Sequence, residues 1–358
     1  MDPTCEELCD RLVGEGVAPM AAAGFARRAN GRWTEGTGGS TDVIFDLASV
    51  TKPVVAVAFA ASGLDRETPL AKWVPETSGT HAGGLPVELL FAHRAGLAAH
   101  GKLWTPLLES PPRPIDRTAA LREAASMVRD DAREAPFAPV YSDLGYALAG
   151  EALVRSIGGP GVRTDEVLEA VIVGPLGLHG ELGSARSLCL LAPDTPVLVA
   201  PTEVVPWRDD SGAPLRGVVH DENAWALAPD GVQGHAGLFG NIHSVLRFGE
   251  AVLDALRGRT SPLSPRGESL EWLVREREGG TLRAGFDGKS GEGSSAGTIL
   301  GPRTFGHLGF TGTSVWIDPD AEVVVALLTN RVCPTRDNVK IRAARPSAHD
   351  ELARAALR

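Results

Sequence analysis

Residues 46–60 read Asp46-Leu47-Ala48-Ser49-Val50-Thr51-Lys52-Pro53-Val54-Val55-Ala56-Val57-Ala58-Phe59-Ala60. Ser49 and Lys52 are three positions apart, so on a helix they lie on one face, with the hydroxyl within reach of the amine. Pro53 follows directly, and proline is tolerated only in the first turn of a helix. The helix is therefore expected to begin at about Ser49, where its dipole favours negative charge.

The apolar run after Lys52 indicates that this helix is buried. An amine at the mouth of such a helix is partly desolvated, and desolvation lowers the pKa of an amine. A lysine with a lowered pKa can take the proton of a serine, which makes the serine a nucleophile. The alternative is a chance Ser-x-x-Lys pair on the solvated face of an amphipathic helix. The apolar residues that flank Lys52 argue against that alternative.

Composition excludes several classes of function. The chain has 358 residues, 43% of them hydrophobic, and a formal net charge of −10 without a basic block, which argues against nucleic acid or an anionic membrane as a partner. No apolar run reaches the roughly 20 residues of a membrane span, and the first residues do not form a secretory signal. The four cysteines include no C-x-x-C pair. We therefore expect a cytoplasmic protein with no cofactor and no metal, and the oligomeric state stays open.

Strand signals occur near both ends of the chain. Asn30-Gly31 is a strong hairpin signal between residues 20–25 and 32–35, and residues 318–321 read as the turn between strands 314–317 and 322–329. Each end also carries a predicted helix. Thr4-x-x-Glu7 reads as the capping box of a helix that ends at Gly14, and Ser347-x-x-Asp350 as the cap of a helix over 348–357.

The middle of the chain is rich in proline, glycine and helical segments. Residues 116–133 and 144–157 read as helices, and residues 291–297 as a loop. Strands at both ends with a helical middle imply an α+β protein with one antiparallel sheet built from both termini. We expect residues 1–62 and 231–358 to form an α/β domain, residues 63–230 a mainly helical domain, and the cleft between them to be catalytic.

A second motif is Tyr141-Ser142-Asp143 at the start of the predicted helix 144–157. A tyrosine phenolate beside a lysine is a workable base, because the lysine charge lowers the pKa of the phenol. The alternative is that Tyr141 only packs at the helix start, with Ser142 or Asp143 as the cap. A third motif is residues 307–313, His-Leu-Gly-Phe-Thr-Gly-Thr. Glycine on an edge strand lets a substrate approach the backbone, and exposed N–H groups there can bind an oxyanion.

Three rival signals are weaker. Residues 293–297 match the nucleophile elbow G-x-S-x-G, but that elbow requires a strand before it and a helix after it. Residues 288–290 resemble the end of a phosphate-binding loop that lacks its first glycine. Residues 220–223 with His235 carry polar side chains without the spacing of a standard metal site, so a hydrogen-bonded cluster at the cleft rim is favoured. His93 and His100 read as structural or exposed.

In this order the three main motifs resemble the serine β-lactamase and penicillin-binding-protein superfamily, in its class C-like branch. That branch includes class C β-lactamases, D-alanyl-D-alanine carboxypeptidases, D-aminopeptidases and related esterases and transesterases. Residues 89–97, 234–239 and 328–331 also resemble segments of its members, so the resemblance covers most of the chain from about residue 21. It implies a β-lactamase/transpeptidase-like fold with a small-molecule ester, amide or peptide as substrate.

The resemblance implies a role for each matching residue. Ser49 is the acylated nucleophile, and Lys52 and Tyr141 share the general acid and base work. The N–H groups of Ser49 and Phe310 form the oxyanion hole. The strand His307 to Phe310, with Gly309, lines the substrate, and Asp143 occupies the position of a substrate-binding asparagine.

Two departures from the family pattern narrow the expected substrate. Asp143 replaces an asparagine, and a carboxylate accepts hydrogen bonds but donates none. Asp143 can instead pair with Lys52, hold it cationic and lower the phenol pKa of Tyr141 further. His307 and Leu308 replace the lysine and threonine of K-T-G. The fixed cation and the hydroxyl that would hold the carboxylate of a β-lactam or peptide are therefore both reduced. Phe310-Thr311-Gly312 is an alternative register for this motif, and we prefer His307 because its first position is polar.

The sequence therefore predicts a serine hydrolase of the esterase, D-aminopeptidase or transesterase type. A true class C-like β-lactamase or a D-Ala-D-Ala carboxypeptidase is one alternative. A non-catalytic binding protein on the same fold is the other, because fold does not fix function.

Overall fold

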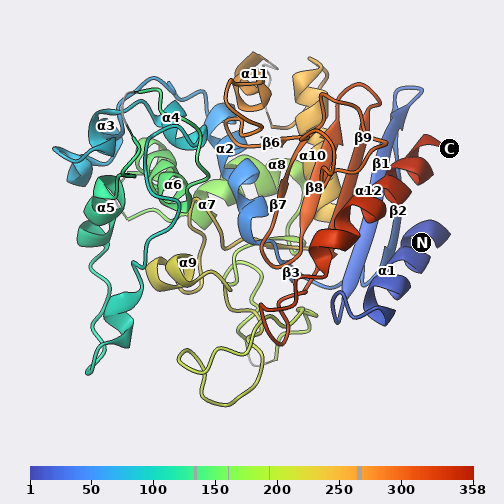
Figure 1. Cartoon of the computed structure of the whole chain (residues 1–358), viewed down its shortest axis with the longest axis horizontal. Helices are drawn as coiled ribbons and strands as arrows, with labels where there is room; N and C mark the ends of the chain where they lie inside the picture. Colours follow the sequence, from blue (N-terminus) through green and yellow to red (C-terminus); the bar gives the residue numbers. More distant parts are fainter. Residues whose placement is uncertain (133–134, 160, 193, 264–267) are drawn as a thin grey trace.

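An antiparallel sheet of six strands dominates the described residues, in the order β2-β1-β9-β8-β7-β6 (Figure 1). The strands are β1 (Ala21–Ala29), β2 (Arg32–Gly39), β6 (Asp287–Gly288), β7 (Phe305–Leu308), β8 (Ser314–Asp318) and β9 (Val323–Thr329). The structure is a computed structural model that describes residues 1–132, 135–159, 161–192, 194–263 and 268–358. Strands from the two ends of the chain meet where β1 pairs with β9, which confirms the predicted α+β sheet.

Both predicted hairpins are present. Asn30 and Gly31 have φ angles of 52° and 78°, as a two-residue turn with both central residues left-handed requires. Ala29 then pairs with Arg32, and the register continues to Ala22 opposite Gly39. The turn between β8 and β9 also lies where the sequence places it.

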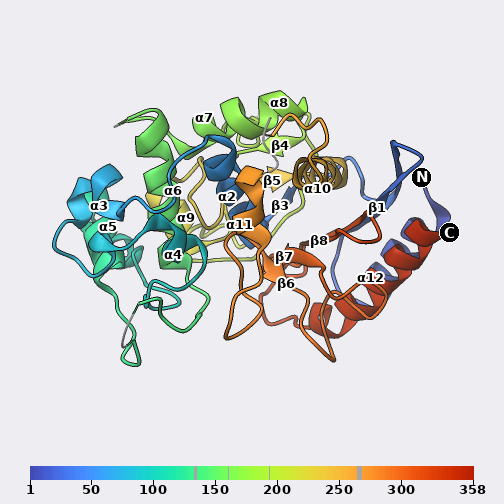
Figure 2. The ribbon, with the colours of Figure 1, turned by 90° about the horizontal axis from the view of Figure 1, so that it is seen from above.

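Both faces of the sheet are covered. Alternate residues of β9 enter different hydrophobic clusters: Val323, Val325 and Leu327 join one, and Val324, Ala326 and Leu328 join the other. Helices α1 (Pro3–Gly14) and α12 (Ile341–Leu357) cover the first face, and α10 (Ile242–Leu256) covers the second (Figure 2). This burial on two sides explains why β9 reads as a continuous apolar run.

The remaining helices lie mostly to the left of the sheet in Figure 1, with α11 at the top of the view. They are α2 (Thr51–Ala61), α3 (Leu70–Trp73), α4 (Val87–Phe91), α5 (Arg117–Ser126), α6 (Asp143–Ile157), α7 (Thr164–Leu168), α8 (Gly174–Leu176), α9 (Glu222–Leu227) and α11 (Glu268–Val274). A second, small sheet consists of β3 (Phe45–Asp46), β5 (Phe239–Gly240) and β4 (Leu182–Gly183). Its strand β3 leads into the start of α2. The division of the chain at residues 62 and 230 stays a prediction.

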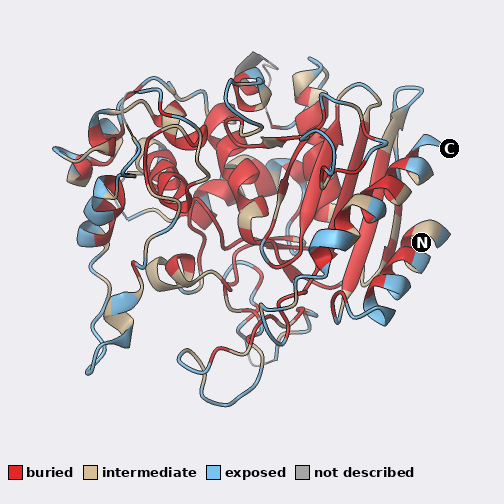
Figure 3. Ribbon diagram, viewed as in Figure 1, coloured by how far each residue is buried: buried red, intermediate tan, exposed pale blue. Residues whose placement is uncertain are grey.

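Helix α2 is buried on every side, as its apolar sequence predicts. All residues from Thr51 to Ala60 are buried, and the helix packs against α6, α7 and α11 (Figure 3). Pro53 lies in its first turn, and a short 3-10 helix over Ala48–Val50 precedes it. The predicted start at Ser49 is therefore confirmed to within two residues.

Three predicted helix boundaries are wrong. The cap of α1 is Asp2, whose Oδ1 accepts from the N–H groups of Thr4 and Cys5, because the helix already begins at Pro3. Helix α12 begins at Ile341 and includes Pro346. Asp350 does not cap it, since its carboxylate accepts instead from the backbone N–H groups of Thr298 and Ile299.

The third wrong boundary is the end of α5. This helix ends at Ser126, because Val128 turns away to form a β-bridge with Leu97. Residue 133, the predicted end, lies outside the described residues. The start of α5 was predicted correctly, since Asp116 is its N-cap. Helix α6 begins one residue before the predicted helix and ends at the same residue.

The four cysteines are free thiols, and Cys5 and Cys9 of α1 pack in the same hydrophobic cluster. The compartment in which the protein works stays a prediction. Within the described ranges we find no helix with the length and apolar character needed to cross a membrane.

Gly150 of α6 and Gly234, in the loop before β5, lie in direct backbone contact. A Cβ added to Gly234 would lie 1.8 Å from the carbonyl oxygen of Tyr146, and one added to Gly150 would lie 2.5 Å from the Cα of Gly234. Only glycine fits at either position. The contact fixes the loop that presents the next residue, His235, to the start of α2.

We predict that Gly234→Ala lowers the free energy of unfolding by about 1–3 kcal/mol, because the backbone has to shift to accept the methyl group. Urea denaturation of the purified variant measures this loss. Gly14→Ala is the matched control, since an added Cβ at this helical position meets no atom within 4 Å, and it should change stability by less than about 1 kcal/mol. Equal stability of the two variants would contradict the close contact.

Candidate active site

Ser49 lies on the short 3-10 helix that leads into α2, and its side chain is partly exposed. The preceding residue, Ala48, has a φ of 46°, a left-handed conformation that costs a non-glycine residue about 1–2 kcal/mol. The buried carboxylate of Asp46 stabilises this turn, because it accepts from the N–H of Ala48 at 2.8 Å and from the N–H of His220 at 2.7 Å. The sequence analysis missed this role of Asp46, which only the folded turn reveals.

Lys52 is completely buried, with its amine against three oxygen atoms. Nζ lies 2.8 Å from Ser49 Oγ, 3.0 Å from the carbonyl oxygen of His235 and 2.6 Å from Asp143 Oδ1. Burial lowers the pKa of Lys52, and the negative charge of Asp143 opposes this effect. The predicted pairing of Ser49 with Lys52 is therefore present, and so is the predicted contact between Lys52 and Asp143.

Tyr141 reaches the same nucleophile from the segment before α6. Its hydroxyl donates to Ser49 Oγ at 2.8 Å, and its ring stacks on His93 with centroids 4.7 Å apart. Ser142 caps α6, because its Oγ accepts from the N–H of Gly145. Ser142 is therefore the helix cap, and the adjacent Tyr141 contacts Ser49, while its catalytic role stays a prediction.

The expected effect of Asp143 on Tyr141 is wrong. Burial raises the pKa of the Tyr141 phenol well above its usual value, and the negative charge of Asp143 raises it further. The prediction rested on the cation of Lys52 alone, whereas desolvation and the carboxylate both disfavour a phenolate. Tyr141 therefore stays a phenol at neutral pH.

Asp143 is the first residue of α6 and lies between two bases. Burial disfavours its carboxylate, but the adjacent Lys52 charge and contact with His100 hold its pKa well below the usual value. His100 Nδ1 lies 2.7 Å from Asp143 Oδ2, although the sequence analysis read this histidine only as structural or exposed. No sequence spacing predicts the pair, because a loop brings residue 100 to the start of α6.

His307 lies on β7 and is buried, with Nδ1 2.8 Å from the carbonyl oxygen of Leu308. Burial, together with the charge of Lys52, lowers its pKa to about 3. His307 is therefore neutral at physiological pH and provides no fixed cation. Its ring centroid lies 6.0 Å from that of Tyr141, so it packs behind the tyrosine.

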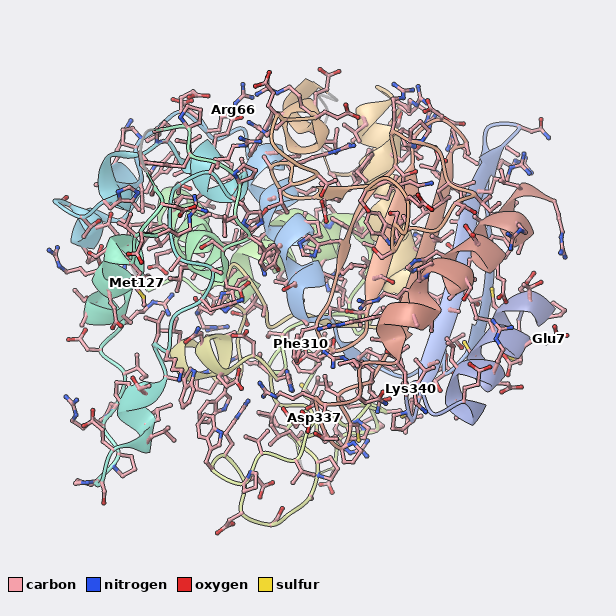
Figure 4. All side chains as sticks on the ribbon, in the orientation of Figure 1. Glu7, Arg66, Met127, Phe310, Asp337 and Lys340 are labelled. Atoms are coloured by element: carbon pink, nitrogen blue, oxygen red, sulfur yellow. The ribbon has the colours of Figure 1, made fainter. Side chains whose placement is uncertain are left out.

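Gly309 and Phe310 follow β7 and line the cavity next to Ser49. A Cβ on Gly309 would lie 1.9 Å from Thr313 Oγ1 and 2.6 Å from the carbonyl oxygen of Leu47, so glycine is required for close packing against the loop before Ser49. This is a different reason from the substrate approach that the sequence suggested. Phe310 is half exposed and lies between α9 and the first turns of α12 in the view of Figure 4.

Together these residues open into a cavity of about 430 Å³. Its lining includes Ala48, Ser49, His100, Tyr141, Asp143, His220, Asp221, Glu222, Leu308, Gly309, Phe310, Arg331, Arg336, Arg342 and Arg345. A second hollow of about 530 Å³, lined by Trp272, Phe305 and several arginines, includes neither Ser49 nor Tyr141. The smaller cavity is therefore the candidate active site.

One wall of this cavity is cationic. Arg331 donates to the carbonyl oxygen of Phe310, and Arg345 donates to those of Gly309 and Thr313. Burial and the repulsion of neighbouring arginines lower the pKa of Arg345 to about 10, so it remains charged. Arg342 is exposed on the same side. We call Arg331, Arg342 and Arg345 the arginine group, and the sequence analysis did not identify it.

The polar cluster predicted at the cleft rim is also present. His235 Nε2 lies 2.9 Å from Asp221 Oδ1, and His220 Nε2 lies 2.9 Å from Glu203 Oε2. In the part of the chain that the structure describes, no group of three or more His, Cys, Asp or Glu side chains is placed to hold a metal ion. Residues 293–297 form turns rather than a strand and a helix, so the elbow geometry is not met.

Comparisons with known proteins agree with this geometry. A putative D-alanyl-D-alanine carboxypeptidase of Salmonella heidelberg (strain SL476) is 27% identical over 323 residues, which span 82% of this chain and 70% of that protein. The solved structure of EstCE1, a hydrolase with promiscuous acyltransferase activity, covers 98% of this chain and 97% of its own at a TM-score of 0.68 and 18% identity. A class C beta-lactamase from Rhodobacter sphaeroides gives a TM-score of 0.66 at 17% identity, with 99% of both chains covered.

The structural neighbours establish the fold, which is the predicted β-lactamase/transpeptidase-like one. The family is established by sequence, because the Beta-lactamase family model matches residues 11–349, nearly the whole chain. With Ser49 and Tyr141 in the cavity lining and the buried Lys52 in contact with Ser49, the chain belongs to the Beta-lactamase family of serine hydrolases.

Proposed function

We propose that this protein forms an acyl-enzyme on Ser49 and acts on an ester, an amide or a small peptide bond. The observation that carries the proposal is the position of Ser49 Oγ, 2.8 Å from both Lys52 Nζ and Tyr141 Oη. A serine in contact with a base and with a second proton donor has the arrangement that nucleophilic catalysis needs.

Lys52 is the better supported base. A neutral amine has two N–H bonds and one lone pair. With one N–H bond donated to the His235 carbonyl, and Asp143 Oδ1 nearby at an ion-pair distance of 2.6 Å, the neutral amine can turn its lone pair toward Ser49 Oγ. Burial lowers the pKa of Lys52, which favours this neutral form, whereas the raised pKa of Tyr141 disfavours a phenolate.

The acyl transfer then proceeds in two steps, acylation of Ser49 and release of the acyl group. Ser49 Oγ attacks the carbonyl carbon while its proton moves to Lys52 Nζ, and the carbonyl oxygen becomes an oxyanion. As the intermediate collapses, the Tyr141 hydroxyl passes its proton to the leaving group and regains one from Lys52. Water, or another acceptor with a transferable proton, repeats the sequence and releases the acyl group from Ser49.

The backbone N–H groups of Ser49 and Phe310 form the proposed oxyanion hole. Gly309 packs against the carbonyl of Leu47, which brings the segment after β7 next to the nucleophile turn. Both residues line the same cavity. Two fixed N–H donors near one reacting carbonyl are the usual means of stabilising its developing charge.

The neutral His307 supports an ester, amide or small peptide as substrate, in an esterase, D-aminopeptidase or transesterase type of reaction. A β-lactam or peptide carboxylate would find no cation at this position, because the pKa of His307 is about 3. The substrate-binding asparagine of the family pattern is also missing, since Asp143 contacts Lys52 and His100 instead.

A D-Ala-D-Ala-type carboxypeptidase is a second candidate, and the arginine group favours it. Arg331 and Arg345 donate to backbone carbonyls next to Phe310, and Arg342 is free to approach a ligand from the exposed side. A guanidinium binds a carboxylate well, because it can donate two parallel charge-assisted hydrogen bonds to the two oxygens. In this second candidate, these cations of the cavity lining supply the charge that the neutral His307 lacks.

A fluorophosphonate probe should label the wild-type protein and leave Ser49→Ala unlabelled, because the probe requires the activated hydroxyl. In-gel fluorescence of the purified proteins measures the labelling. Ser295→Ala is the matched control, since it removes the serine of the rival G-x-S-x-G motif, and it should label like wild type. Equal labelling of Ser49→Ala and wild type would refute the proposal, and failure of every acyl probe with measurable ligand binding would favour a binding protein.

Arg342→Ala separates the two candidate substrates. If the arginine group binds a terminal carboxylate, the KM for an N-acyl-D-Ala-D-Ala peptide should rise about tenfold, the usual effect of losing one charge-assisted contact. The kcat/KM for a p-nitrophenyl ester without a charge should stay within about twofold. Arg354→Ala, on the same helix but paired with Asp350, is the control. An equal change for both substrates would contradict carboxylate binding.

A further inference from the structure

Asp143 carries a charge at a position where the family pattern has a neutral amide, and its two oxygens contact two different bases. Oδ1 lies 2.6 Å from Lys52 Nζ, and Oδ2 lies 2.7 Å from His100 Nδ1. The loop that carries His100 is fixed to the same site, since the N–H of Asp143 donates to the carbonyl of Ala99 at 2.9 Å. The carboxylate therefore connects a buried lysine to a histidine at the cavity rim.

The two bases differ in their access to solvent. The side chain of Lys52 is 0% exposed, whereas that of His100 is 68% exposed. A proton on His100 costs little desolvation, while a proton on Lys52 leaves an ammonium group without water. One carboxylate needs only one positive partner. A proton held by His100 can therefore neutralise Asp143 in place of a proton held by Lys52.

We propose that His100 is a positioning residue that holds the proton neutralising Asp143, and thereby lets Lys52 rest as the neutral amine that activates Ser49. The proposal rests on the function proposed above. The proton of Ser49 moves to Lys52 as the Oγ–carbon bond forms, and it leaves with the departing group through Tyr141. His100 keeps its own proton throughout, so no further reactant is needed.

The charges that face His100 support this role. Contact with Asp143 raises the pKa of His100, and the more distant charge of Asp221 adds to the effect. Burial and the charge of Lys52 oppose it. His220 and Glu222 line the same cavity. With an asparagine at position 143, no charge would need neutralising, and His100 would have no such role.

The test is the pH profile of kcat/KM for a p-nitrophenyl ester in wild type, His100→Ala, Asp143→Asn and the double variant. Without His100, Asp143 has only Lys52 as its cation, so the pKa of the base rises. We expect His100→Ala to move the acid limb upward by about one pH unit. At pH values below the acid limb, the kcat/KM of His100→Ala should be about tenfold lower than that of wild type. At high pH the two values should converge. In the Asp143→Asn background the same substitution should change kcat/KM by less than about twofold at every pH.

Two controls separate charge from structure. His100→Gln keeps a hydrogen-bond donor for Asp143 but carries no charge, so it should behave like His100→Ala. His179→Ala should leave the pH profile unchanged, although His179 matches His100 in exposure, at 68%, and in its 2.7 Å contact with a carboxylate of Glu169. Thermal unfolding of each variant checks that it is folded.

Four outcomes would overturn this inference. His100→Ala could leave kcat/KM unchanged, or lower it equally at every pH. His100→Gln could restore the wild-type profile, or His100→Ala could have the same effect in the Asp143→Asn background. Fluorophosphonate labelling of Ser49 in the same variants distinguishes the two proposals. Labelling without a shifted limb contradicts only the role of His100. Absence of labelling in wild type contradicts the proposed function itself.

Discussion

The burial of the Lys52 amine is the constraint on which the active site depends. A buried amine needs hydrogen-bond partners in place of water whether it is neutral or charged, and three elements supply oxygen atoms to that of Lys52. Ser49 comes from the turn before α2, Asp143 from the start of α6, and His235 from the loop before β5. Each of these elements is in turn held by its own packing, such as the contact of Gly150 with Gly234.

Charge is distributed unevenly around the nucleophile, and this distribution distinguishes the site from the family pattern. The charges of Asp143 and Asp221 act on the Lys52 amine, while Arg331 and Arg345 of the arginine group contact the segment after β7. His307 stands at the position where the K-T-G motif of the family has a lysine, but its side chain is neutral. The cations of the cavity are therefore arginines rather than a residue of β7, and the negative charge of Asp143 next to Lys52 needs a positive partner. The proposed role of His100 and the second candidate substrate both follow from this rearrangement.

Local patterns predicted the parts of the structure that depend on local physics. The spacing of Ser49 and Lys52 and the Asn30-Gly31 turn each refer to a few adjacent residues, and each is found where the sequence placed it. The start of α12 was missed because Asp350, which reads as a cap, is used to hold a distant loop. The pKa of Tyr141 was predicted in the wrong direction, since burial is a property of the whole fold. The contact of His100 with Asp143 spans a loop whose course no local pattern specifies.

The most direct test of this account is intact-mass measurement of the wild-type protein during turnover of short esters, D-amino acid amides and β-lactams, followed by peptide mapping. The account predicts a transient mass increase equal to the acyl group of an ester or amide, located on the peptide that contains Ser49. An acyl group on any other residue, or no adduct with any substrate that the protein turns over, would contradict it.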